Sequence, residues 1–229
     1  MHKIIEPSIL YFGTPVVLIS TLNEDCTANL APISSAFWLG WRCMLGIAAS
    51  AKTYQNLMRN HECVINLPSI AEVSAINRLA LTTGACPVPE RKLSRGYRYE
   101  PDKFARAGLT RAASETIAPP RVKECPIQLE ARVEGTHILA AEKDDLRGFV
   151  VCFETRIMRV HADESVLVSG ESNRIDPDKW RPLIMSFQKY YGLGGELHES
   201  ALATIPERAY HTSDIDRARS VHPQDAALP

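Results

Sequence analysis

Four β-like runs lie within the first 67 residues of the chain, and most of the links between them are short. They cover residues 16–21, 28–35, 42–48 and 63–67. The first run is apolar and rich in β-branched residues, and it ends at polar residues 22–25, which is typical of a hairpin loop. Pro32 in the second run indicates a sheet edge or a bulge. This arrangement favours a meandering antiparallel sheet or barrel over a parallel α/β sheet.

A second group of strand signals follows a long irregular segment. Residues 127–133 alternate apolar and polar side chains, which predicts a half-buried strand. The β pattern continues at residues 136–142 and 148–161 and ends with a short strand at 166–168. The segment between the two groups, residues 85–120, is rich in proline and basic residues, and we interpret it as a lid or a dimer arm.

Helical signals are few and short. They predict helices at residues 53–60, after the capping box at 69–72, at 102–107 and, C-terminally, at 176–191. The last helix would begin at Asp176-Pro177 and bury Trp180, Ile184, Phe187 and Tyr191 on one face. Residues 196–229 are polar, and we expect a loosely held tail from residue 211 onward.

The chain is therefore expected to form a single, mainly β domain over residues 1–229, with α additions at its periphery. The barrel would cover about residues 10–170 and carry the 85–120 segment as a loop insertion.

Charge and composition exclude several classes of protein. The chain has 26 Lys and Arg against 27 Asp and Glu, and no long basic block argues for a nucleic-acid partner. No apolar run is long enough to span a membrane, and the first 13 residues lack the features of a secretory signal. We therefore expect a cytoplasmic protein. The six cysteines contain no CxxC pair, which argues for structural thiols.

The standard catalytic motifs are also missing. The sequence contains no GxGxxG after a strand, no P-loop, no GxSxG and no HExxH, and its histidines are dispersed. Hydrolase and metalloenzyme readings are therefore disfavoured, and we predict no metal site.

Small polar residues gather instead in two clusters, at residues 29–35 and 48–53. The second cluster directly precedes a predicted helix, where free amides, a lysine and hydroxyls suit a phosphate. The first could bond the polar edge of a flat ring through backbone and hydroxyl groups. Each cluster also has a plain structural explanation, because Ser50 could simply cap the helix and residues 28–35 could be an ordinary edge strand.

Longer strings carry a resemblance to a known family. YFGTPVVLIST, NLAPISSAFWLG, GIAASAKTYQNL and CVINLP occur in that order, and APPRVKECPIQLEARVEGTHI and EKDDLRGFVVCFETRIMRVH follow. Over roughly residues 7–191 the chain resembles the flavin reductase-like family, which contains FMN-binding split barrels such as flavoredoxins and NAD(P)H:flavin oxidoreductases. The pairing of the N-x-A-P-x-S run with the S-x-K-T-x-x-N run is its most specific part.

The resemblance implies an antiparallel six-stranded Greek-key split β-barrel that forms a homodimer, with flavin near the subunit interface. The implied contacts to the flavin ring and ribityl chain are Asn29, Ala31, Pro32, Ile33, Ser34 and Ser35. The implied contacts to the ribityl and phosphate groups are Ala48, Ala49, Ser50, Lys52 and Thr53, with Asn56 behind them. His137 would lie on the nicotinamide side and Tyr191 could cover the flavin, although a paired strand histidine and a core tyrosine explain these two equally well.

The implied activity is hydride transfer from NAD(P)H to FMN, with no catalytic side chain in the usual sense. The partner could be a monooxygenase or an electron-transfer protein. Two alternatives stay open: an FMN-bound electron carrier that a protein partner reduces, and a barrel that binds another ligand. Arg91, Lys92 and Arg95 could meet a nucleotide phosphate, an acidic partner or only water.

Overall fold

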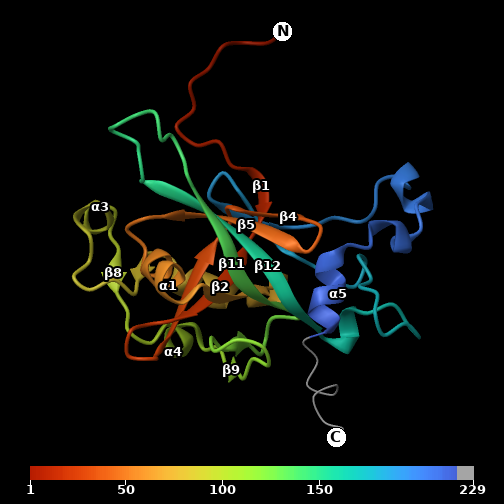
Figure 1. The fold of residues 1–229 in the computed structure, drawn as a ribbon. Helices are drawn as coiled ribbons and strands as arrows, with labels where there is room; N and C mark the ends of the chain where they lie inside the picture. The colour runs from red at the N-terminus through yellow and green to blue at the C-terminus, as the bar shows by residue number, and fades with distance from the viewer. Residues whose placement is uncertain (221–229) are drawn as a thin grey trace, which may run out of the picture.

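A seven-stranded antiparallel sheet organises the chain, for which the computed structural model describes residues 1–220 (Figure 1). Its strand order is β3-β2-β6-β11-β12-β5-β4, and β3 and β4 form its two edges. The strands are β2 (Val17–Leu22), β3 (Ala28–Ile33), β4 (Ala36–Leu39), β5 (Arg42–Ala48), β6 (Glu62–Leu67), β11 (Ile127–Ile138) and β12 (Val150–Ala162). The mainly β prediction is confirmed. The sheet does not close, and the expected six-stranded Greek-key order is not confirmed.

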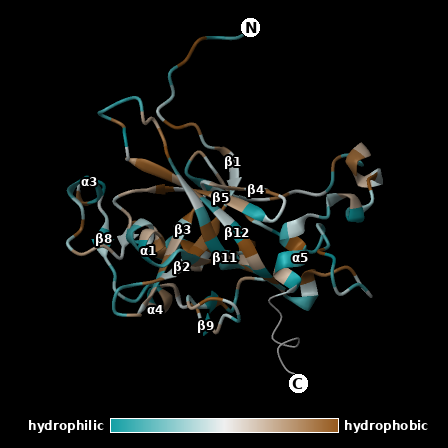
Figure 2. Cartoon of the chain, viewed as in Figure 1, coloured by the Kyte–Doolittle hydropathy of each residue, from teal (hydrophilic) through white to brown (hydrophobic). Residues whose placement is uncertain are grey.

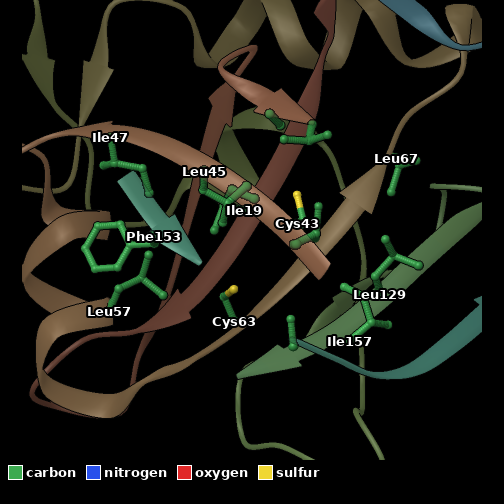
Figure 3. Close-up of a cluster of buried hydrophobic side chains, with 14 of the residues drawn as sticks. Ile19, Cys43, Leu45, Ile47, Leu57, Cys63, Leu67, Leu129, Phe153 and Ile157 are labelled. Atoms are coloured by element: carbon green, nitrogen blue, oxygen red, sulfur yellow. The ribbon is translucent and has the colours of Figure 1, made fainter. Parts of the chain in front are cut away.

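One face of the sheet packs into the first hydrophobic core, which Figure 3 shows in close-up. Ile19, Leu45 and Phe153 project into it from three strands, and Leu57 reaches it from helix α1 (Lys52–Asn60). Cys43 lies in the same cluster, and burial raises the pKa of its thiol to about 12. This cysteine therefore acts as a small apolar core residue, as the sequence predicted.

The opposite face of the sheet packs into a second core. Val17 and Ile19 of β2 point into the first core, whereas Leu18 points into the second. Because alternate residues of a strand face opposite sides, burial on both sides explains why residues 16–19 are apolar without interruption. Helices α2 (Val73–Leu79) and α4 (Lys103–Ala107) cover this second face, and Figure 2 shows apolar segments at the centre of the fold.

Short elements complete the fold. They are 3₁₀ helices η1 (Ile70–Glu72), η2 (Glu164–Val166), η3 (Ala201–Thr204) and η4 (Glu207–Tyr210), helix α3 (Glu90–Leu93), and strands β7 (Thr82–Thr83), β8 (Arg98–Tyr99), β9 (Arg111–Ala112) and β10 (Arg121–Val122). The capping box at Ser69 and Glu72 is present, as expected. Residues 166–168 do not form the predicted strand, because the Asp163 side chain accepts from the Ser165 amide and begins η2 instead.

The first half of the polar face of β11 is buried, not exposed as the alternating pattern suggests. Glu130 is fully buried because residues 114–120 fold over it. Its carboxylate accepts bonds from the amides of Glu115 and Thr116, from the Thr116 hydroxyl and from His161. Burial opposes ionisation, but these bonds outweigh it and lower the pKa of Glu130 to about 2. A buried carboxylate thus anchors part of the 85–120 segment to the sheet.

The expected C-terminal helix at residues 176–191 is wrong. After one turn at Asp176, the chain forms a hairpin of β13 (Leu183–Ser186) and β14 (Lys189–Gly192), and β13 also pairs with β1 (Phe12–Pro15). Phe187 and Gln188 have positive φ angles of 44° and 65°, which is typical of a two-residue hairpin turn. The spacing of the apolar residues fits a short helix equally well. Because β13 pairs with β1, the segment forms strands instead.

The polar tail is also more ordered than expected within the described residues. Helix α5 (Ser213–Arg219) contacts β12 and buries Ala218. Asp214 pairs with Arg42 at 2.9 Å, and Arg42 pairs with Glu154 at 2.6 Å. The end of the predicted tail, residues 221–229, lies outside the described part of the chain. None of the described helices is both long and apolar enough to cross a bilayer.

Candidate functional site

A cavity of about 210 Å³ lies where several separate segments of the chain meet. Ala31, Pro32 and Ile33 of edge strand β3 form one wall, and Gly46, Ile47 and Ala48 of β5 form the second. The beginning of α1, at Ala51, Lys52 and Thr53, also lines the cavity. The third wall consists of residues 79–84 together with Lys92, Tyr97 and Lys103.

A wider depression of about 460 Å³ adjoins the cavity and shares Lys52 and Gly84 with it. It is lined by residues 23–29 and by polar side chains of the 85–120 segment, including Tyr99 and Arg111. Ligand pockets commonly enclose about 300–1,000 Å³. A ligand of nucleotide size would therefore fill the cavity and extend out of it.

The two polar clusters of the sequence thus meet in one cavity. Ala31, Pro32 and Ile33 come from the first cluster, and Ala48, Lys52 and Thr53 come from the second. They are brought together because the chain just after β3 meets β5, where the Gly46 amide donates to the Ser35 carbonyl at 2.8 Å, and because β5 ends shortly before α1. Pro32 lies on an edge strand, as the sequence predicts.

The start of α1 is free of side-chain caps. Ala51 is the N-cap residue and Ser50 is exposed, so the alternative that Ser50 merely caps the helix is wrong. By helix geometry the amides at positions 52–54 have no intrahelical acceptor. These amides and the positive end of the helix dipole suit an anion, and a phosphate in particular.

Asn29 lies beneath the start of α1, not on the cavity wall between β3 and β5. Its Nδ2 donates to Thr53 Oγ1 at 3.1 Å and to Thr21 Oγ1 at 3.3 Å. The side chain is 2% exposed, and its Oδ1 has no hydrogen-bond partner within the protein. A Cβ on Gly84 would lie only 2.6 Å from this oxygen, so only glycine fits at position 84 without rearrangement.

Three lysines line the cavity in different electrostatic states. Lys52 donates from Nζ to Glu24 Oε2 at 2.6 Å, which lowers the pKa of Glu24. Lys92 donates to Thr83 Oγ1 at 3.3 Å, and burial lowers its pKa. Lys103 is 4% exposed, and burial lowers its pKa to about 7. The cavity therefore gathers three lysines, and burial disfavours the charged form of two of them.

Several predicted residues stay outside this cavity. Ser35 Oγ bonds to Tyr11 Oη at 3.0 Å, and Ser34, Ala49 and Ser50 lie in turns that do not line the cavity wall. Asn56 is fully buried, and its Nδ2 donates to Thr21 and Asn23 at 3.0 Å. It therefore braces α1 against β2 and the loop after it, behind the cavity.

The two tentative residues lie elsewhere in this chain. His137 is on β11, with its side chain 59% exposed and its Nε2 3.9 Å from Glu154 Oε2. Tyr191 is on β14, opposite Ile184, and is 51% exposed. Neither lines the cavity, so a role for them at a bound flavin stays a prediction.

Sequence reasoning missed the third wall. The polar triplet Thr82-Thr83-Gly84 resembles the two predicted clusters in composition and could have been noticed. Nothing in the sequence indicates that Lys103 is buried, because it directly follows the N-cap Asp102 of a short helix, where a lysine is normally solvated. Its burial arises from the packing of α4 against α2 and β3.

Comparison with known proteins identifies the family. The family model described as "Flavin reductase like domain" matches residues 9–194, which is most of the chain. The chain therefore belongs to the flavin reductase-like family and has its split-barrel fold.

The proteins similar to this chain include an uncharacterised relative, a flavoredoxin and a monooxygenase component. The chain is 42% identical over 195 residues to an uncharacterised protein, YdfE, of Bacillus subtilis, covering 85% of this chain and 91% of the relative. It is similar in structure to flavoredoxin of Desulfovibrio vulgaris (Miyazaki F), with a TM-score of 0.69, 23% identity, and 89% and 99% of the two chains covered. For nitrilotriacetate monooxygenase component B from Bacillus cereus, the TM-score is 0.66, the identity is 22%, and the coverage is 84% and 89%.

Proposed function

We propose that this protein binds FMN in the cavity between β3, β5 and α1 and transfers a hydride to it from NAD(P)H. The observation that carries the proposal is the meeting of two polar clusters, separated in sequence, around one cation-lined cavity at a helix start. Membership of the flavin reductase-like family and the structural similarity to an FMN-binding domain of a flavin reductase-like enzyme from Shewanella baltica support it.

The residues present fit a flavin mononucleotide. The free amides at the start of α1, with Lys52 and Thr53, would hold the phosphate. Ala31, Pro32 and Ile33 would meet the ribityl chain and ring through their backbone, while Lys92 would add charge on the opposite wall. The unpartnered Oδ1 of buried Asn29 is a spare acceptor next to the same helix start.

Bound flavin would supply the redox chemistry, accepting a hydride from the nicotinamide and passing electrons onward. The protein would bind and orient the cofactor and balance the charge of its phosphate. We therefore assign no catalytic acid or base.

A visible spectrum tests the proposal. Purified protein supplied with FMN should be yellow, and NADH or NADPH added without oxygen should bleach it. Protein that neither retains FMN nor binds it on titration would refute the proposed site.

The same experiment separates a second candidate function, which the similarity to flavoredoxin favours. If the bound flavin ignores both nicotinamide nucleotides but accepts electrons from a reduced protein, the chain is an electron carrier. The component B relative instead favours a partner monooxygenase that uses the reduced flavin.

Replacing Lys52 with alanine should weaken FMN binding about tenfold and leave riboflavin binding nearly unchanged. The ammonium can form a charge-assisted bond to the phosphate, typically worth about 1.5–3 kcal/mol. Glu24 competes for it at 2.6 Å, which places the effect at the lower end. Fluorescence titration with the two flavins measures the difference.

Glu24→Gln is the matched control, because it releases Lys52 from its ion pair. It should keep or tighten FMN binding. An equal loss of both flavins in Lys52→Ala would show that the lysine is not at the phosphate.

A further inference from the structure

Lys103 is a buried lysine whose side chain has no partner within the described part of the chain. It is 4% exposed, and no hydrogen bond or ion pair of the described chain reaches its ammonium. Burying an unpaired ammonium costs several kcal/mol, and such groups are normally paired or ligate something. A methionine of similar length would fill the same space without this desolvation cost.

The position of Lys103 indicates what compensates this cost. It lines the same cavity as Lys92, Lys52 and the start of α1. Three lysines and a helix start around about 210 Å³ form an anion site, and a phosphomonoester brings close to two negative charges. An anion in the cavity would supply the missing partner.

The surrounding charges do not neutralise Lys103. The charge of Lys92 lowers the pKa of Lys103, and the charge of Glu100 raises it. Burial has the largest effect and brings the pKa of Lys103 to about 7. The other charged groups of the packed elements are engaged elsewhere: Arg78 of α2 on the Ala107 carbonyl, Arg111 on Asp102, and Glu124 on the Thr110 amide. At neutral pH an empty site therefore holds Lys103 partly neutral.

We propose that Lys103 is a ligand of the flavin phosphate and takes up one proton from solvent when FMN binds. This inference rests on the proposed FMN site and adds to it a specificity residue that selects phosphate-bearing flavin over riboflavin. The amine nitrogen forms one new N–H bond with a proton from solvent and becomes an ammonium, and the phosphate dianion matches its charge.

The sign of the pH dependence follows from this linkage. Below pH 7 Lys103 is already protonated, so FMN affinity should change little until the phosphate itself gains a proton near pH 6. Above pH 7 each binding event must add a proton to Lys103. The affinity should then fall up to about tenfold per pH unit.

The test measures FMN and riboflavin binding between pH 7 and pH 9 by calorimetry in two buffers with different ionisation enthalpies. The wild-type protein should take up close to one proton with FMN at pH 8 and none with riboflavin. Lys103→Met should lose the proton uptake and the pH slope, and bind FMN about 10- to 100-fold more weakly at pH 7. Lys92→Met, which alters a half-buried lysine of the same cavity, should keep a pH slope, with its midpoint moved to higher pH because Lys92 lowers the pKa of Lys103.

The outcomes separate the two proposals. FMN binding without proton uptake, unchanged in Lys103→Met, overturns the role of Lys103 and leaves the FMN site standing. Failure of the wild-type protein to bind FMN at any of these pH values overturns both. Thermal unfolding provides a folding check, because Lys103→Met removes an unpaired buried charge and should raise Tm without ligand.

Discussion

Gly84→Ala should weaken FMN binding by about 10- to 100-fold and destabilise the protein. The added Cβ would lie 2.6 Å from Asn29 Oδ1 and 3.3 Å from the Lys52 side chain, and both contacts are too close. Asn29 cannot retreat easily, because it is 2% exposed and bonded to Thr21 and Thr53. Overpacking a buried site costs about 1–3 kcal/mol of stability. Relief of this strain by moving Asn29 and Lys52 would disturb the site at the start of α1, and a binding loss of about 1.4–2.8 kcal/mol corresponds to this fall in affinity.

FMN titration and urea unfolding of Gly84→Ala measure the two effects. Gly194→Ala is the control, because a Cβ there would meet nothing within 4 Å and its φ is not positive. It should behave as wild type in both assays. Wild-type FMN affinity in Gly84→Ala would contradict a binding site at the junction of Gly84, Asn29 and Lys52.

Glu130→Gln should lower the free energy of unfolding by about 3 kcal/mol at pH 7. The carboxylate is fully buried and holds His161 together with the amides of Glu115 and Thr116. An amide can replace only part of this acceptor set, and its NH₂ group would face donors. For a chain of this length the change corresponds to a fall in Tm of roughly 6–12 °C.

The pH dependence of stability gives a second readout for Glu130. Its folded pKa of about 2 is below the unfolded value, so its contribution is complete above about pH 4.3 and is lost as the pH falls toward 2. Glu130→Gln should remove this part of the acid sensitivity. Glu164→Gln, at an exposed position, should change stability by less than about 0.5 kcal/mol. A similarly small effect for Glu130→Gln would contradict the anchoring role.

The strands of the sheet could be predicted because each hairpin leaves a local signal. Short polar links, β-branched runs and Pro32 at an edge place β2, β3, β5 and β6 close to their observed bounds. The hairpin at residues 183–192 could not, because the spacing of Ile184, Phe187 and Tyr191 fits a helix as well as it fits two strands. What decides between them is pairing with β1, more than 160 residues earlier in the chain.

The candidate site was also predictable only in part. Ala31, Pro32, Ile33, Ala48, Lys52 and Thr53 were found because each cluster is continuous in sequence and the second precedes a helix. The wall formed by Gly84, Lys92 and Lys103 was missed because it is assembled from separate loops and helices. Burial of Glu130 and Lys103 depends on how the 85–120 segment folds, and no local pattern records that.

The central claim is that FMN binds with its phosphate at the start of α1. A crystal structure of the protein with FMN tests it most directly. The claim predicts the phosphate within hydrogen-bond distance of the amides at positions 52–54 and of the Lys103 ammonium, with the ribityl chain along Ala31–Ile33. A flavin bound elsewhere, or a phosphate that contacts neither α1 nor Lys103, would contradict it.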